Sequence, residues 1–315
     1  MKKIIKDFLG MPFNLDASLT FVELIQSKNL EPFIISWHDL PSNIFKEHIL
    51  FLKPYKPIPL DELIKRKKDN KSIKGCFAIT FDDGVETTVK DISNVCMAMN
   101  WPVTFYLPTN YINGESLPFQ KVEFIKTYLS DGKYSAYNKK NYLNKNEITK
   151  PELIKYLQNL IYFENAKEVK EILDYFVEKI LENKNENFYK EKTSKPISWK
   201  QIREISSNPM ISFQSHGVTH TAVSALKEQE IEQEMKISKR QIEEITNKRV
   251  HSFCYPYGNA QSINNVATNI AKKYFESATT LIRGRLKESN DFYLPRIDLH
   301  KNDSKGSVRL KLAIN

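Results

Sequence analysis

Two adjacent carboxylates are the first residues of this sequence with a clear chemical signature. Asp82 and Asp83 follow the apolar run 76–81 and lie within residues 80–84, TFDDG. An Asp-Gly pair often forms a hairpin turn, but here a helical pattern follows instead of a second strand. The pair therefore falls at the carboxyl end of a buried strand, where α/β proteins place their sites. Because like charges so close together resist joint ionisation, the pair predicts a cation nearby.

Two histidines supply further ligands for such a cation. His216 and His220 lie in residues 215–220, SHGVTH, and their four-residue spacing lets both rings face one ion. The HxxxH pattern by itself is also found in ordinary packing. Combined with one carboxylate, it becomes an Asp-His-His ligand set. Such a set leaves coordination positions open for water and substrate, as a hydrolytic metal requires.

A third segment follows in chain order. Residues 253–258, FCYPYG, taken alone are a strand followed by a Pro-Gly turn. Together, the ordered motifs TFDDG, HxxxH and YPYG resemble the polysaccharide deacetylase family, also called the NodB-homology or carbohydrate esterase family 4 group. The first strand adds to the resemblance, because residues 36–39, SWHD, stand where the poly-N-acetylglucosamine deacetylase branch carries a Tyr-His pair. Apart from an insertion, the resemblance covers about residues 32–300.

The resemblance implies a fold and a reaction. The family fold is a distorted (β/α)7 barrel, and the family reaction is metal-dependent removal of an acyl group from a sugar. For this chain we expect removal of an N-acetyl group from an amino sugar of a glycan or glycan precursor. Carried over by motif, Asp82 would be the general base, while Asp83, His216 and His220 would hold the metal. The metal is usually Zn²⁺ in this family, with Co²⁺ or Ni²⁺ as alternatives.

The third segment carries an implied role and a departure from the family pattern. The resemblance assigns the oxyanion to the backbone N–H of Tyr257, the first donor after Pro256, which has none. The family motif often begins with an arginine that steadies the base, and Cys254 occupies that position here. We expect Arg296, from a late strand, to steady Asp82 instead. The alternative is an ordinary strand-end ion pair with a neighbouring aspartate.

Two histidines compete for the role of general acid. Family members commonly use a histidine in a late Leu-x-His motif, whose end His300 resembles. His38 is the other candidate, because the first-strand resemblance puts it at the mouth of the barrel. Either ring could instead be a surface or core histidine. Trp37, next to His38, is predicted to stack on a sugar ring.

Alternating strand and helix patterns must position these residues. Short apolar runs alternate with amphipathic stretches, which by itself favours a parallel α/β barrel or a large open sheet. The predicted strands are residues 32–38, 76–81, 103–107, 210–215, 250–255, 277–281 and 293–299. The predicted helices between them include residues 20–28, 61–68, 198–206, 227–246 and 263–274, with a further helix after Gly84.

Residues 113–195 have a different character. They are rich in Lys, Asn and Glu, contain three helical patterns at 119–129, 151–162 and 166–181, and lack a strand pattern. We interpret them as a helical insertion in a single domain that spans residues 1–315, because so long a loop without structure is improbable. Since the insertion leaves from the carboxyl end of a strand, we expect it to overhang the barrel mouth. There it would serve as a substrate lid or as the contact surface of a homo-oligomer.

Composition limits the partners. The chain has 315 residues, 41% of them hydrophobic, and a net charge of +9, so it is long and apolar enough to fold. No nucleic-acid-binding motif accompanies the positive charge, whose Lys residues alternate with Glu along helices. We therefore expect a carbohydrate partner and no nucleic acid. The excess positive charge would favour a phosphate-linked sugar.

The cellular location is inferred from cysteines and apolar segments. Three cysteines without a CxxC pattern fit a reducing compartment. No apolar window is long enough for a transmembrane helix, and the N-terminal MKKIIK lacks a cleavage site. We expect a cytoplasmic enzyme that acts on a nucleotide-linked, lipid-linked or soluble sugar, with peripheral membrane contact if the substrate is lipid-linked. An N-deformylase and a catalytically silent carbohydrate-binding barrel are the alternatives.

Overall fold

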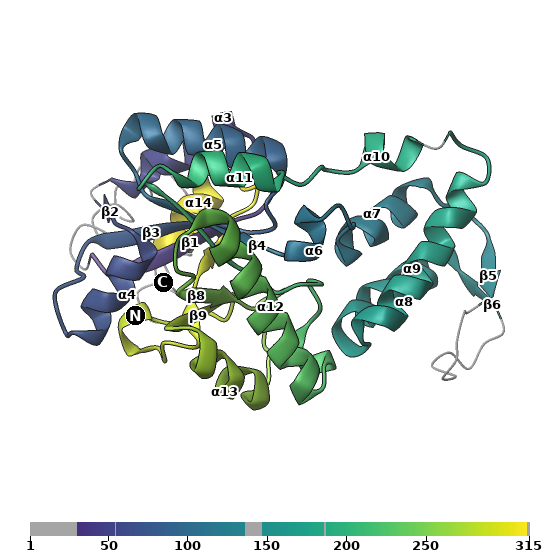
Figure 1. Ribbon diagram of the computed structural model, residues 1–315. Helices are drawn as coiled ribbons and strands as arrows, with labels where there is room; N and C mark the ends of the chain where they lie inside the picture. Colours follow the sequence, from purple (N-terminus) through teal and green to yellow (C-terminus); the bar gives the residue numbers. More distant parts are fainter. Residues whose placement is uncertain (1–29, 54, 136–146, 186, 314–315) are drawn as a thin grey trace, which may run out of the picture.

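The computed structural model describes residues 30–53, 55–135, 147–185 and 187–313 (Figure 1). The helix predicted at residues 20–28 and the N-terminal MKKIIK segment lie outside the described residues. Within the described ranges, no helix is both long and apolar enough to span a bilayer.

Parallel strands form the wall of a barrel. Neighbouring strands pair in the order β10-β9-β8-β7-β4-β3-β1-β11, each pair parallel, and the short β2 (Lys56–Pro57) adds to β3. The main strands are β1 (Phe33–Trp37), β3 (Cys76–Phe81), β4 (Val103–Leu107), β7 (Ile211–Ser215), β8 (Ser252–Cys254) and β9 (Ser277–Thr280). Their positions agree with the strand patterns of the sequence.

A single late segment closes the barrel. β10 (Leu294–Pro295) pairs with β9, whereas β11 (Ile297–Asp298) pairs with β1. Only Arg296 separates β10 from β11, so the two ends of the strand order meet on one stretch of chain. Counting that stretch once, seven parallel strands surround the axis in the described chain. This confirms the predicted distorted (β/α)7 barrel.

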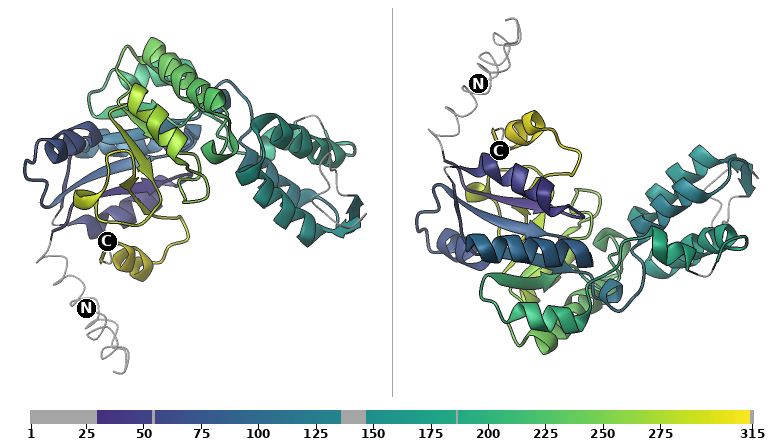
Figure 2. Two further views of the ribbon diagram at one scale, coloured as in Figure 1. Left: turned by 90° about the horizontal axis from the view of Figure 1, so that it is seen from below. Right: turned by 90° about the horizontal axis from the view of Figure 1, so that it is seen from above.

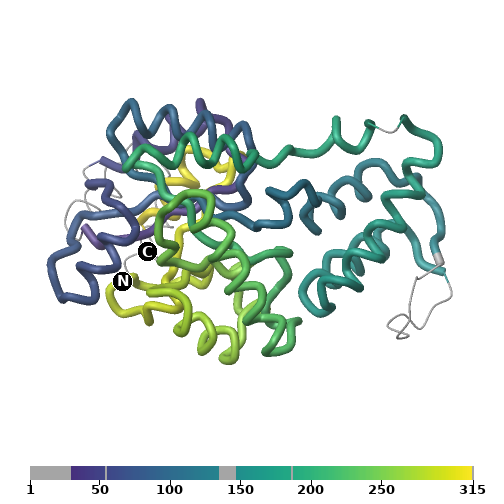
Figure 3. Tube along the Cα trace, viewed as in Figure 1, coloured from purple at the N-terminus to yellow at the C-terminus, as the bar shows by residue number. Residues whose placement is uncertain are grey.

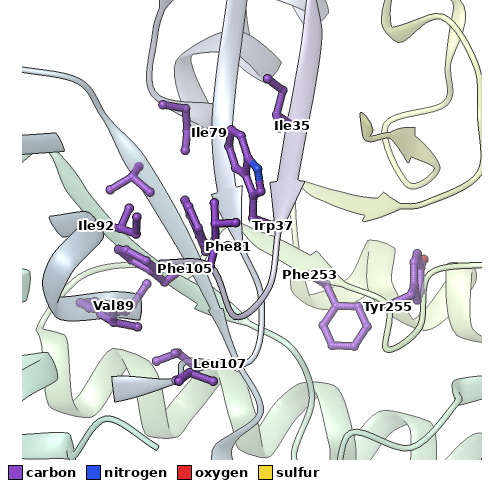
Figure 4. Packing of buried hydrophobic residues seen from close by; sticks show 14 of the residues in the cluster. Ile35, Trp37, Ile79, Phe81, Val89, Ile92, Phe105, Leu107, Phe253 and Tyr255 are labelled. Carbon is purple, nitrogen blue, oxygen red and sulfur yellow. The ribbon is translucent and has the colours of Figure 1, made fainter. Parts of the chain in front are cut away.

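Each strand has two different faces. On the outer face, four rings lie in register on neighbouring strands, with centroids 5.2, 5.7 and 5.7 Å apart. These rings are Trp37, Phe81, Phe105 and Phe213, and Figure 4 shows the first three. They belong to the main apolar core, together with Phe45 and Val89 of the covering helices. Alternate residues point into the barrel, because side-chain direction along a strand has a period of two.

Helices cover the barrel wall (Figures 1 and 2). They are α3 (Ser42–Ile49), α4 (Leu60–Lys68), α5 (Glu86–Met99), α11 (Trp199–Ser206), α12 (Glu228–Thr246), α13 (Asn265–Tyr274) and α14 (Lys305–Ala313). The Ser198 side chain caps α11 by accepting a hydrogen bond from the Gln201 N–H, and the Gln201 side chain accepts one from the Ser198 N–H. The capping-box spacing predicts this reciprocal pair. Helix α14 had no counterpart among the sequence predictions.

The insertion forms a separate lobe beside the barrel (Figures 1 and 3). After the short α6 (Thr109–Ile112), the lobe consists of α7 (Pro118–Tyr128), α8 (Lys150–Phe163), α9 (Ala166–Leu181), α10 (Phe188–Lys192) and a hairpin of β5 (Lys133–Ser135) with β6 (Glu147–Thr149). We call this part the helical lobe. It has its own apolar core, distinct from that of the barrel.

The hairpin corrects one prediction. The insertion was expected to contain helices only, but β5 and β6 pair antiparallel. Each strand has three residues, and Tyr134 and Ile148 are the side chains that they bury. Strands of three residues are too short to show an alternation of polar and apolar residues. The sequence therefore has no strand pattern at these positions.

Candidate active site

The three motifs lie at one end of the barrel. Each follows directly after a strand, at β3, β7 and β8, and the carboxyl ends of parallel strands share one rim. The φ angles of Asp83, His220 and Tyr257 are 72°, 56° and 63°. These angles lie in the left-handed region, which residues other than glycine rarely adopt. Strained residues of this kind concentrate at functional sites. Here each motif contributes one.

One carboxylate and two imidazoles converge at this rim. The Nε2 atom of His220 lies 3.4 Å from Asp83 Oδ1, and the Nε2 atom of His216 lies 3.9 Å from the same oxygen. One ligand atom from each of the three side chains lies within 4.8 Å of the others, and all three residues are buried. The structure thus brings together the ligand set that the sequence suggested.

The chemistry of these donors fits a divalent cation. His216 Nδ1 lies 2.8 Å from the carbonyl oxygen of Cys254, which leaves Nε2 with a free lone pair, the usual arrangement of a metal-binding histidine. Burial lowers the pKa of His216 to about 4, so the ring is neutral. Burial also raises the pKa of Asp83 to about 7. The buried Asp83 Oδ1 has no hydrogen-bond donor in the described chain, and a bound cation would supply its missing partner.

A second group of possible ligands is already neutralised. Asp82, His216 and Cys254 also come within 4.8 Å of one another. However, the Arg296 guanidinium donates to Asp82 and lies 3.0 Å from the Cys254 sulfur. Burial raises the pKa of the Cys254 thiol well above its usual range, so the sulfur is protonated and a poor ligand. The Asp83 group therefore offers the better ligands for a cation, and we call Asp83, His216 and His220 the candidate metal-site residues.

Asp82 is held by two parallel hydrogen bonds. Arg296 Nη1 and Nη2 donate to its two carboxylate oxygens, each at 2.7 Å. Burial alone would raise the pKa of Asp82, but the guanidinium outweighs burial and keeps the pKa below its usual value. The contact that a steadying arginine requires is thus present. In the described chain, Arg296 forms no ion pair with Asp298, which was the alternative.

The two candidate acids lie on either side of Asp298. His38 places Nδ1 3.7 Å from Asp298 Oδ1 and Nε2 3.7 Å from Asp82 Oδ2. His300 Nε2 lies 3.0 Å from Asp298 Oδ2, and its side chain is 59% exposed. His38 lines the same cavity as Asp83 and His220, whereas His300 lines a separate cavity of about 250 Å³.

Trp37 does not face a sugar. Its side chain is fully buried on the outer face of β1, where it stacks on Phe81 and donates from Nε1 to His48 Nδ1 at 3.1 Å. The prediction that Trp37 is a stacking platform is therefore wrong. The reason is the alternation of side chains along a strand, which puts Trp37 and His38 on opposite faces.

This placement gives a testable expectation for Trp37. Trp37→Ala should lower the free energy of unfolding by about 3–5 kcal/mol, because it leaves a large cavity in the core. Urea unfolding followed by fluorescence or circular dichroism measures this loss. A variant of unchanged stability whose KM for substrate rises would instead support a sugar-binding role.

Glu234 is a site residue that the sequence analysis missed. It is buried on α12, and its carboxylate accepts hydrogen bonds from the N–H groups of Val218 and Thr219 at 2.6 and 3.0 Å. These bonds hold the loop that carries the two metal-site histidines. The alternating Lys and Glu residues of this stretch indicate a helix with solvent-exposed faces, which hides the buried Glu234. A signal was present, because Glu234 shares a helical face with the buried Ile231 and Ser238.

The helical lobe forms one wall of the site. A cavity of about 740 Å³ lies over the metal-site residues and is lined by the barrel rim and by α7, α8 and the segment after α10. The Phe119 ring of α7 lies 5.7 Å from the ring of His220, and Tyr257 lies 4.8 Å from His220 and 4.9 Å from Tyr162 of α8. The metal-site ring of His220 is therefore packed between an aromatic side chain of the lobe and one of the barrel.

Comparisons with known proteins agree with this geometry. A model of the family described as "Polysaccharide deacetylase" matches residues 69–275. The fold is similar to that of Streptococcus pyogenes deacetylase PplD in complex with acetate, with a TM-score of 0.59 and 14% identity over 90% of this chain and 99% of that one. It is also similar to IcaB from Ammonifex degensii, with a TM-score of 0.57 and 13% identity over 90% and 97% of the two chains.

A de-N-acetylase from Aggregatibacter actinomycetemcomitans is similar as well, with a TM-score of 0.55 and 14% identity over 89% of this chain and 99% of that one. At these identities the likeness concerns the fold. No curated protein sequence matches the chain.

Proposed function

This chain belongs to the polysaccharide deacetylase family, and from that premise we propose that it uses Zn²⁺ to remove the N-acetyl group of an amino sugar. The family reaction is the metal-dependent hydrolysis of an amide C–N bond on an acetylated carbohydrate. One observation carries the assignment to this site. Asp82 is a buried carboxylate kept ionised by Arg296, next to an Asp-His-His set suited to a cation.

The ligand roles follow from the donor atoms. Asp83, His216 and His220 would hold the cation, and two nitrogens with one oxygen are a common ligand set of hydrolytic zinc sites. When bound, the cation supplies a Lewis acid for the acetyl carbonyl and acidifies water. Glu234 holds the histidine loop in place through the backbone of Val218 and Thr219.

Asp82 acts as the general base in this proposal. Its depressed pKa keeps it ionised at neutral pH, and the paired hydrogen bonds from Arg296 fix the orientation of its oxygens. It accepts the proton of the attacking water. The backbone N–H of Tyr257 then donates to the developing oxyanion. Among the hydrogen bonds of the described residues, none engages this N–H.

His38 protonates the departing nitrogen. Burial opposes its charged form, yet nearby carboxylates outweigh burial and raise the pKa of His38. These carboxylates belong to Asp82, Asp83 and Asp298. A raised pKa keeps the ring protonated near neutral pH. The proton taken up by Asp82 can then return to His38 across 3.7 Å, so both groups regain their starting charge after each turnover.

The choice between the two histidines is tested by pH–rate profiles. Because only the protonated ring donates, kcat should fall as the pH rises through the pKa of His38, which lies above its usual value of 6.5. His38→Ala should remove this alkaline limb and lower kcat by roughly 100-fold. His300→Ala is the matched control and should keep the limb. Loss of the limb in His300→Ala alone would assign the acid to His300, and loss in neither would reject both.

The proposed function itself is tested by acetate release. We expect the zinc-loaded protein to release acetate and free amine from N-acetylglucosamine oligomers, to lose this activity on chelation, and to regain it when Zn²⁺ is restored. Asp82→Asn with metal restored serves as the catalytic control. If the protein binds zinc and oligomers but releases no acetate, the chain is a binding barrel and the proposal fails.

A further inference from the structure

The helical lobe presents one continuous face to the cavity. From α7, the side chains of Gln120, Phe124, Thr127 and Tyr128 line it. Counted from Gln120, the other three lie four, seven and eight residues further on, which puts all four on one side of the helix. From α8, Gln158 and Tyr162 line the cavity one helical turn apart. The two helices thus build a shared wall opposite the barrel rim.

This wall extends well beyond the metal-site residues. Phe119 at the start of α7 contacts the ring of His220, whereas Tyr128 lies at the end of the same helix. The rise of an α-helix separates these two positions by about 13 Å along its axis. Figure 1 shows α7 leading away from the barrel. A single acetyl group at the metal end would therefore leave most of the cavity of about 740 Å³ unfilled.

The side chains of the far part suit a carbohydrate. Tyr128 and Tyr162 are half-buried, so their rings have an accessible side. Gln158 is exposed, and its amide has no hydrogen-bond partner in the described chain. Sugar rings have an apolar C–H face that packs on aromatic rings and hydroxyl groups at the edge that bond to amides.

The charges around the cavity favour a neutral ligand. Two cationic side chains line the cavity, those of Lys192 and Lys301. Two carboxylates outside the metal centre also line it, those of Asp39 and Glu123. These four charges cancel, so the excess positive charge along the cavity is that of the catalytic centre, the protonated His38 and the proposed cation. A phosphate or pyrophosphate group beyond that centre would require an excess of positive charge there. The net charge of +9 therefore resides elsewhere on the molecule.

We propose that Tyr128, Gln158 and Tyr162 of the helical lobe form a binding site for the sugar residues next to the one that is deacetylated. The ligand is a neutral oligosaccharide of amino sugars, seated between the lobe and the barrel. This inference rests on the proposed function and adds to it that the lobe selects chains over single sugars.

The test compares substrates of increasing length. For the zinc-loaded wild type, kcat/KM should rise from N-acetylglucosamine to its short oligomers. In Tyr128→Ala and Gln158→Ala, the ratio of kcat/KM for long over short substrates should fall by roughly tenfold, equivalent to about 1.4 kcal/mol of lost binding. Tyr128→Phe keeps the ring and its packing on Phe124 and Phe188, and should keep most of the ratio.

Tyr175→Ala is the matched control, because Tyr175 is a 43% exposed tyrosine of the same lobe that does not line the cavity. Its length dependence should equal that of the wild type. An unchanged ratio in both Tyr128→Ala and Gln158→Ala would overturn the inference. So would faster turnover of a nucleotide-linked monomer than of any neutral oligomer.

Binding measurements separate this inference from the proposed function. Calorimetry with N-acetylglucosamine oligomers reports the lobe site without turnover. If wild type binds long oligomers more tightly and Tyr128→Ala does not, while neither releases acetate, the lobe site stands and the deacetylase proposal fails. If both release acetate with the same dependence on length, the deacetylase proposal stands and the lobe site fails.

Discussion

Asp82→Asn is expected to lower kcat by roughly 10³-fold, the contribution typical of a positioned general base. An amide cannot accept the proton of the attacking water. The bound metal should remain, because Asp82 is held by Arg296 and is not part of the proposed ligand set. Acetate release and metal content, measured on the same preparation, check both statements.

The same substitution should also destabilise the fold. It leaves the buried Arg296 guanidinium without its counter-charge, which typically costs about 3–5 kcal/mol. Adding Arg296→Met removes that unpaired charge and should recover much of the stability, measured by urea unfolding. It should not recover kcat. Near wild-type activity in the Asp82→Asn/Arg296→Met protein would contradict the role of Asp82 as base.

His220→Ala is expected to abolish activity by weakening metal binding more than about 100-fold. His220 Nε2 points toward Asp83 Oδ1, and its replacement leaves one carboxylate and one imidazole at the proposed site. A ligand that binds the folded protein raises the melting temperature. Added Zn²⁺ should therefore stabilise the wild type against heat and leave His220→Ala nearly unchanged.

His251→Ala provides the matched control for this metal experiment. His251 is also a histidine of the barrel, but it pairs with Glu276 at 3.0 Å, away from the metal-site residues. Its loss should lower the free energy of unfolding only slightly, because surface ion pairs contribute at most about 1 kcal/mol to stability. Full zinc-dependent stabilisation in His220→Ala, or its loss in His251→Ala, would contradict the assigned metal site.

The positions of strands and helices were predicted well because their patterns are local, whereas the resemblance supplied the choice of a barrel over an open sheet. The apolar run CFAITF becomes β3 with the same bounds, Cys76–Phe81, and the motifs directly follow their strands. Parallel strands place their carboxyl ends on one rim whatever the length of chain between them. From this rule the carboxylate pair and the two histidines were expected to meet, and the resemblance pointed to Asp83 as the ligand. In the structure Asp83, His216 and His220 lie together.

Other features depend on how distant strands meet inside the barrel. Arg296 reaches Asp82 across 214 residues of sequence, and this contact exists because the segment between β10 and β11 closes the barrel beside β1. The family pattern puts an arginine at the position of Cys254, on another strand. No local pattern states which of the inward-facing side chains meet across the axis.

The face on which a side chain lies, and the surfaces that line the cavity, were hardest to predict from the sequence. The sequence grouped Trp37 with its neighbour His38, but the alternation along β1 separates them. It predicted a helical insertion over the barrel mouth, but not that α7 and α8 would be the helices that line the cavity. By itself, the sequence determined where the strands and helices lie and that the three motifs follow strand ends, since local patterns specify these. Its resemblance to the family supplied the roles expected of Asp82, Asp83, His216 and His220. The tertiary structure alone decided between Asp82 and Asp298 as the partner of Arg296, and it alone fixed the place of each candidate acid and the shape of the cavity. These features depend on contacts between segments far apart in the chain.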